Sequence, residues 1–108
     1  MTKEELLNTQ TVSMKFGIGG YDVSASLEFR KSALKNALEN FFTDEFTNDI
    51  VTNVAVAMAI QDLALFQPIT YNMSNNDSII NVGTYNNINI WVDESMDFDD
   101  TRLIYILK

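Results

Sequence analysis

Five carboxylates lie within ten residues beside the only tryptophan of the chain, in the stretch WVDESMDFDD (Trp91–Asp100). Clustered carboxylates can bind a hard cation, so residues 93–100, here called the acidic segment, are a candidate calcium loop. Counted from Asp93, oxygen-bearing side chains stand at positions 1, 3, 5 and 7. Position 6, which needs glycine for a sharp turn, is Phe98, and position 12, which needs a chelating glutamate, is Ile104. The residues therefore argue against a calcium loop.

Acid–base hydrolysis is the other chemistry that this cluster could perform, as two carboxylates in unlike environments do in glycosidases. Asp93 beside Trp91 loosely fits the apolar half of such a pair, but the remaining acids stand on a polar turn. The chain has no histidine and no cysteine, which excludes a Ser-His-Asp triad, a histidine base, thiolate chemistry, disulfides and Cys/His zinc sites. We therefore expect a protein that is not an enzyme and needs no cofactor or metal.

Charge is distributed unevenly along the chain. The net charge is −8, and the residues between Asn36 and Thr101 include eleven acids and no base. Such a chain should repel phosphate backbones, so we expect no direct binding of nucleic acid. Three bases stand close together at Arg30, Lys31 and Lys35. The imbalance has two open interpretations, namely solubility alone or a basic patch that pairs with an acidic patch on a neighbouring chain.

The length of 108 residues predicts one domain. Residues 1–11 are expected to form a short helical arm or a loose tail, and residues 12–108 a single α+β domain. No apolar run approaches the roughly 20 residues of a membrane helix, and the acidic, polar N-terminus is not typical of a secretory signal. No membrane association is therefore expected.

An N-terminal β-hairpin is the clearest structural prediction. Apolar and polar residues alternate over 12–18 and again over 21–29, which is typical of half-buried strands. Gly19 and Gly20 between them can supply the positive φ angles of a two-residue turn. They lack the further glycines and the lysine of a phosphate-binding loop.

One or two central helices should follow the hairpin. Apolar residues three and four apart over 33–42 predict a helix that begins at Arg30 or Ser32. Thr43-Asp44 could cap a second helix that Pro68 ends. Its buried face would consist of Phe46, Ile50, Val54, Ala57 and Met58. Within it, large residues alternate with alanines over Val54–Ile60, so a strand remains possible there, although alanine favours a helix.

The last part of the chain predicts a loop and then three antiparallel strands packed on the helices. Residues 67–78 are rich in Asn and Ser and are typical of a loop. The strands are expected at 79–82, 88–92 and 103–107, and Asn86-Asn87 suits the turn between the first two because asparagine tolerates left-handed backbone. Strands on both sides of a helical region indicate an α+β fold.

Apolar residues near the acidic segment are candidates for protein contacts. If the isoleucine-rich side of 88–92 packs on the helices, Trp91 faces the opposite side, where a tryptophan often marks an interface. Met96 and Phe98 could dock on a neighbour or fold back on their own core. The interface candidates are Arg30, Lys31, Lys35, Trp91, Asp93, Met96, Asp97, Phe98, Asp99 and Asp100.

The segment VGTYNNINIWVDESMDFDDTRLIY (Val82–Tyr105) resembles a segment near the C-terminus of tailed-bacteriophage major capsid proteins. Gly83-Thr84 matches the family's turn, Ile90–Asp93 its strand with the following aspartate, and Leu103–Tyr105 its last strand. Residues Met14–Glu39 are more weakly similar to the strand that enters the long spine helix of those proteins.

The resemblance implies a non-catalytic structural virion protein, a minimal or accessory version that self-assembles or docks on head proteins. It implies a location in the virion after assembly in the host cytoplasm. The chain departs from the family in its small size and in Glu94, where the family usually has proline. The alternative is a small acidic binding or inhibitor protein that occupies a basic site on a host or phage protein, which the base-free acidic span suggests.

Overall fold

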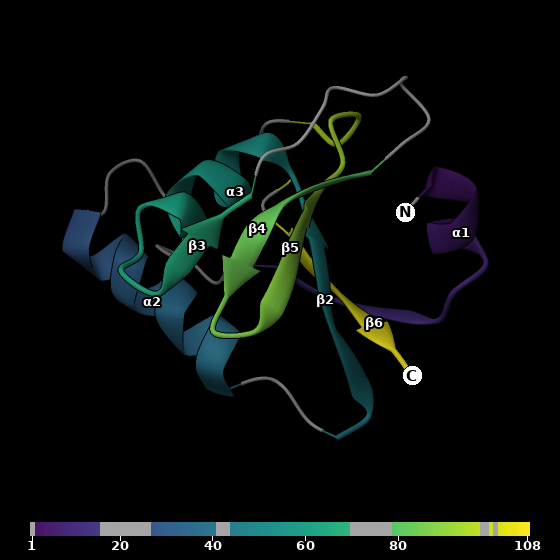
Figure 1. Cartoon of the computed structure of the whole chain (residues 1–108), viewed down its shortest axis with the longest axis horizontal. Coiled ribbons are helices and arrows are strands. Elements are labelled where there is room, and N and C mark those ends of the chain that lie inside the picture. The colour runs from purple at the N-terminus through teal and green to yellow at the C-terminus, as the bar shows by residue number, and fades with distance from the viewer. Residues whose placement is uncertain (1, 16–26, 41–43, 70–78, 98–99, 101) are drawn as a thin grey trace.

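The computed structural model is a six-stranded mixed sheet with helices on both of its faces (Figure 1). The structure describes residues 2–15, 27–40, 44–69, 79–97, 100 and 102–108. In chain order its elements are α1 (Lys3–Leu7), β1 (Thr11–Lys15), α2 (Leu27–Asn40), β2 (Phe46–Thr52), α3 (Val54–Gln61), β3 (Phe66–Pro68), β4 (Ile80–Tyr85), β5 (Ile88–Val92) and β6 (Arg102–Leu107). The predicted α+β class is confirmed.

The strand order is β1-β6-β2-β5-β4-β3. Strands β4 and β5 form a hairpin whose turn residues Asn86 and Asn87 have φ angles of 47° and 69°. Positive φ at both central positions is the hairpin geometry expected of this pair, so the predicted turn is confirmed. Strand β6 does not continue the hairpin, because β2 lies between β5 and β6, parallel to the first and antiparallel to the second.

The predicted N-terminal hairpin is wrong in its pairing. Strand β1 pairs with β6, at the other end of the chain, and sets Val12 opposite Tyr105. Residues 27–29, assigned from the sequence to the second hairpin strand, begin helix α2. Three residues are too few to distinguish a period of two from a period of 3.6. The rest of the predicted second strand, with its Gly-Gly turn, lies outside the described residues.

The predicted second helix begins too early. Residues 46–52 form strand β2, and the helix starts only at Val54, where Asn53 caps it. Phe46 and Ile50 are buried as expected, but a spacing of four places two residues on one side of a strand as well as of a helix. Over Val54–Ile60 the helix is confirmed, although Val54 and Met58 are exposed rather than buried.

The segment after α3 also differs from the prediction. The helix ends at Gln61, and Pro68 belongs to β3, an edge strand where a missing N–H is tolerated. Gly83-Thr84, expected to be a turn, lies inside β4 at an irregularity in the pairing with β5. Gly83 has a φ of +155°, and a Cβ atom there would come within 2.4 Å of the carbonyl oxygen of Gln67, so glycine lets β3 approach β4.

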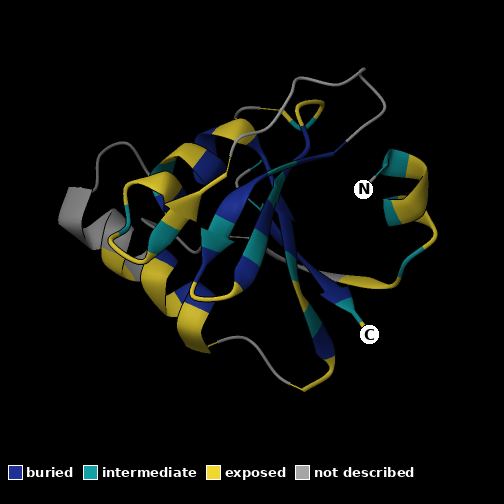
Figure 2. Cartoon of the chain, viewed as in Figure 1, coloured by how far each residue is buried: buried dark blue, intermediate teal, exposed yellow. Residues whose placement is uncertain are grey.

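Two apolar clusters pack on the sheet, one on each of its faces. Buried residues are concentrated on the strands of the sheet (Figure 2). The helix face packs against α2 and α3, and its buried residues include Leu34, Leu38, Ile50, Val56, Ile60, Tyr85, Ile90, Leu103 and Tyr105. The second face is smaller. Its buried residues are Val51, Ile79, Ile104 and Ile106, and the partly buried Leu6, Trp91 and Met96 pack against them. Leu6 comes from α1, so this short helix lies over the second face (Figure 1).

Candidate functional site

The acidic segment leaves the end of β5 and returns to the sheet at β6. Its first residue, Asp93, is buried, and its backbone N–H donates to the carbonyl of Thr52 at 2.9 Å. The Asp93 Oδ1 atom accepts hydrogen bonds from the backbone N–H of Ser95 at 3.0 Å and from the Ser95 hydroxyl at 2.7 Å. A carboxylate that bonds the backbone two residues on is a turn-forming device. Asp93 therefore fixes the start of the segment.

A buried asparagine connects the acidic segment to helix α3. The Asn53 Oδ1 atom accepts from the backbone N–H of Val56 at 2.8 Å, which caps the helix. Its Nδ2 donates to the carbonyl oxygen of Asp97 at 3.0 Å. Sequence reasoning missed Asn53, although an asparagine directly before a helical run is a typical N-cap. Its second contact, 44 positions along the chain, has no local signal.

Two carboxylates of the acidic segment form ion pairs within the chain. The Asp93 Oδ1 atom lies 3.6 Å from Lys3 Nζ, and Lys3 also donates to the Ser95 hydroxyl. Asp100 accepts two hydrogen bonds from Arg102, at 2.7 and 2.8 Å, and this interaction raises the pKa of the guanidinium. The bases that contact these acids thus come from α1 and from β6.

Trp91 faces away from α2 and α3, as predicted, and is half-buried against the second-face cluster. Its indole N–H donates to Asp49 Oδ1 at 2.9 Å, and Asn89 Nδ2 donates to the same oxygen at 3.0 Å. Met96 packs against the same cluster, so of its two alternatives it folds back on its own core. Met96 thus packs the acidic segment against the second face, and the hydrogen bond of Trp91 links β5 to β2.

The remaining interface candidates are spread over the chain. Lys35 on α2 and Asp97 in the acidic segment are exposed. Arg30 and Lys31 belong to α2, but their side chains lie outside the described residues, as do Phe98 and Asp99. Their proposed role in contacts between chains stays a prediction.

No group of three or more acids is arranged to hold a metal ion among the residues that the structure describes. In the same part of the chain, no helix is long and apolar enough to cross a membrane. The described contacts of Asp93, Asp97 and Asp100 build and anchor the segment.

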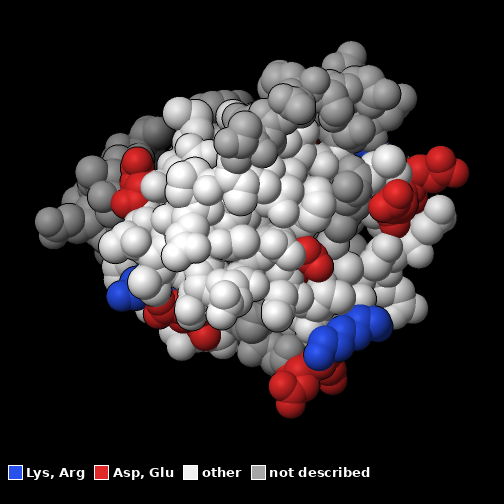
Figure 3. All heavy atoms as spheres, in the orientation of Figure 1, with Lys and Arg blue, Asp and Glu red and all other residues white. Residues whose placement is uncertain are grey.

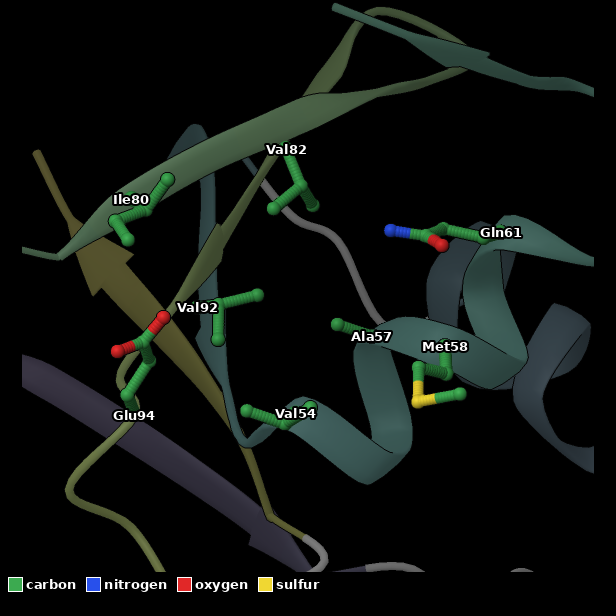
Figure 4. A pocket seen from close by; sticks show the side chains of 8 residues that line it. All are labelled: Val54, Ala57, Met58, Gln61, Ile80, Val82, Val92 and Glu94. Carbon is green, nitrogen blue, oxygen red and sulfur yellow. The ribbon is translucent and has the colours of Figure 1, made fainter. Parts of the chain in front are cut away.

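A pocket of about 220 Å³ opens between α3 and strands β4 and β5 (Figure 4). Its wall is apolar over most of its extent, and a carboxylate and an amide are its polar groups. The lining residues are Val54, Ala57, Met58, Gln61, Ile80, Val82, Val92 and Glu94. Because Glu94 belongs to the acidic segment, the pocket and the segment are neighbours. The sequence did not predict this pocket.

The comparisons with known proteins gave no match: no family model, no curated protein and no solved structure is similar to the chain.

Proposed function

We propose that this chain is a non-catalytic structural virion protein of a tailed bacteriophage, either a capsid protein or a capsid-associated one. It would act by self-assembly or by docking on head proteins. The proposal rests on the resemblance of Val82–Tyr105 to capsid proteins and on the use that the fold makes of that segment. The segment spans most of β4, all of β5, the acidic segment and most of β6, and these strands form much of the sheet.

The position of Asp93 is the observation that carries a structural rather than a catalytic role. Asp93 is the aspartate of the resemblance, and it is buried and bonded to Ser95 and Lys3. A general acid or base needs access to a substrate proton, whereas these contacts hold a turn in place. The Asp93 carboxylate connects the end of β5 to the acidic segment and to the N-terminal helix. Such connections make a protein rigid, as a subunit of an assembled particle should be.

The alternative of a small acidic inhibitor has less support. A protein that imitates nucleic acid needs a continuous negative surface to attract a basic partner. On the face seen in Figure 3, the described Asp and Glu side chains form separate groups with uncharged surface between them. Over the described residues, this face therefore offers no continuous negative surface, and for that reason we favour assembly through local contacts.

Light scattering coupled to size-exclusion chromatography tests self-assembly. We expect the mass to rise with protein concentration, and the double variant Asp97→Lys with Asp99→Lys to reduce the fraction of large species. The matched control is Asp44→Lys with Asp62→Lys, which makes the same charge change at two exposed acids outside the acidic segment. The control should assemble like the unchanged chain.

Docking on head proteins is tested by mixing the chain with purified bacteriophage heads and sedimenting them. Co-sedimentation that the Asp97/Asp99 variant weakens would support the proposal. A strict monomer at high concentration that also stays in the supernatant would overturn it.

A further inference from the structure

The pocket beside α3 is bordered by two apolar side chains that this helix leaves exposed, while core residues form the rest of its apolar wall. Helix α3 buries Ala55, Val56, Ala57 and Ile60, yet Met58 is 59% exposed and Val54 is 39% exposed. Figure 4 shows Val54, Ala57 and Met58 on one side of the hollow and Ile80, Val82 and Val92 on the strands across from it. An exposed methionine at the mouth of an apolar hollow is typical of an adaptable binding surface.

The volume of the pocket limits what it can hold. Sites for drug-sized molecules usually measure about 300–1,000 Å³, and an apolar cavity of about 150 Å³ accepts benzene. At about 220 Å³ the pocket is too small for the first class and large enough for one aromatic or branched apolar side chain. Its size therefore fits an anchor residue of a protein segment.

The polar groups indicate what should stand beside that anchor. Glu94 and Gln61 lie at opposite ends of the pocket, with apolar side chains between them (Figure 4). No base is among the lining residues, and the chain as a whole carries a net charge of −8. A lysine or arginine next to the anchor would therefore meet the carboxylate of Glu94. The Gln61 amide can pair with a backbone group of the same segment.

We propose that this pocket binds a segment of a partner protein in which one bulky apolar side chain stands next to a lysine or arginine. The inference rests on the proposed function only in taking the partner to be a protein. Binding at the pocket does not require that the partner belong to a virion.

The probe is the blocked dipeptide N-acetyl-Phe-Lys-amide, titrated into the full chain and followed by the methyl signals of Met58, Val82 and Val92 in NMR spectra. We expect saturable shifts with a dissociation constant on the order of millimolar, as suits one buried side chain. N-acetyl-Phe-Glu-amide should bind at least about three-fold more weakly. In this peptide the carboxylate of Glu94 meets a second carboxylate in place of the lysine ammonium group, so a solvent-exposed attraction becomes a repulsion. N-acetyl-Ala-Lys-amide should give no saturable shift.

Two variants test the pocket itself. Met58→Lys places a cation at the mouth and should abolish the binding of Phe-Lys, and the matched control Leu7→Lys, at a position 84% exposed on α1, should leave it unchanged. If the Met58→Lys variant does not fold, the Met58→Gln variant is used for the same test. Glu94→Gln should retain binding but bring the affinities of the Phe-Lys and Phe-Glu peptides to about the same value.

The proposal is overturned if Phe-Lys causes no saturable shift, if Ala-Lys binds equally well, or if Glu94→Gln preserves the preference for Phe-Lys. Failure of the virion proposal would look different. A chain that stays monomeric and does not sediment with heads, yet binds Phe-Lys at the pocket, overturns only the virion function. A chain that assembles and does not bind the peptide overturns only the pocket.

Discussion

The two faces of the sheet are stabilised in different ways. The helix face is covered by α2 and α3, of 14 and 8 residues, and is built mainly from a large apolar cluster. The hydroxyl groups of Tyr85 and Tyr105 add hydrogen bonds to α2, at Glu39 and at the carbonyl of Ala37. The second face is covered by the five-residue α1, none of whose residues is buried (Figure 2). An ion pair links Lys3 of α1 to Asp93, and Trp91 on this face donates a hydrogen bond to Asp49. The comparison indicates that apolar burial holds the fold on one face, while polar contacts order the acidic segment on the other.

Strand β5 makes this comparison testable, because neighbouring residues point to opposite faces. Ile90 lies in the helix-face cluster and is fully buried, whereas Trp91 is half-buried in the second-face cluster. Substitutions on the helix face should reduce the free energy of unfolding most. Those on the second face should mainly change the environment of Trp91 and of the acidic segment.

The largest loss of stability is expected for Ile90→Ala on the helix face. The change removes a fully buried side chain and leaves a cavity, which costs about 2–5 kcal/mol of the free energy of unfolding. Urea denaturation followed by circular dichroism measures it. Leu7→Ala, at an exposed site, should change stability by less than about 0.5 kcal/mol. Equal losses in the free energy of unfolding of Ile90→Ala and Leu7→Ala would contradict the view that burial on the helix face stabilises the fold.

Asp49→Ala should have an intermediate effect on the second face. It removes the acceptor shared by Trp91 and Asn89 and leaves two part-buried donors without it, at a cost of about 1–2 kcal/mol. Because Trp91 is the only tryptophan, its emission should shift to longer wavelength in the folded variant.

Asp49→Asn, which keeps one oxygen acceptor, should shift the Trp91 emission less than Asp49→Ala does. Asp62→Ala, at an exposed acid, serves as the control and should leave the emission unchanged. An unchanged emission in Asp49→Ala would mean that this hydrogen bond does not determine where the indole lies.

A smaller effect, dependent on pH, is expected for Tyr85 on the helix face. Burial, followed by the hydrogen bond to Glu39 at 2.9 Å and by the charge of that carboxylate, raises the pKa of Tyr85 to about 12. Since the folded pKa exceeds the unfolded value of about 10, this contribution is fully present below pH 10 and is lost as pH rises towards 12. Burial also raises the pKa of Tyr105.

Tyr85→Phe tests this pH dependence through urea denaturation at about pH 8 and about pH 11.5. At the lower pH the variant should be less stable by about 0.5–1.5 kcal/mol, because it lacks the hydrogen bond. At the higher pH the difference should shrink, since only the unchanged chain loses stability by ionisation of this phenol. A difference that is equal at both values would contradict the raised pKa.

The elements with strong local signals were predictable. The Asn86-Asn87 turn and the strand over Ile88–Val92 each have a pattern that is complete within a few residues. Over Val54–Ile60 the pattern suits both helix and strand, and the alanine content favoured the helix that the structure has. Side chains alternate between the two faces of a strand, so the isoleucine-rich side of Ile88–Val92 predicted that Trp91 faces away from the helices. The fold class followed from the order of these elements.

Pairings between distant segments could not be predicted. Strand β2 was mistaken for a helix because Phe46 and Ile50 suit both periods, and nothing local indicates that it inserts between β5 and β6. No local pattern in the sequence indicates the contacts of the acidic segment either. Lys3 reaches Ser95 across 92 positions of the chain, and the pocket forms only when α3 packs against β4 and β5.

The smallest effect is expected for Lys3→Gln, which removes the ion pair between α1 and the acidic segment. The Lys3 side chain is 35% exposed, so water and salt weaken its attraction to Asp93, and the loss should stay below about 1 kcal/mol. It should fall further at about 1 M salt, where screening acts within about 3 Å. Thermal unfolding at low and high salt measures this loss, and Lys35→Gln on α2 is the charge-matched control.

A small, salt-sensitive loss in Lys3→Gln alone would mean that charge helps to hold α1 on the second face. A loss that salt does not change would instead mean that the apolar contact of Leu6 with the second-face cluster holds α1 in place. Both faces would then be stabilised by apolar burial, and they would differ only in how much apolar surface is buried.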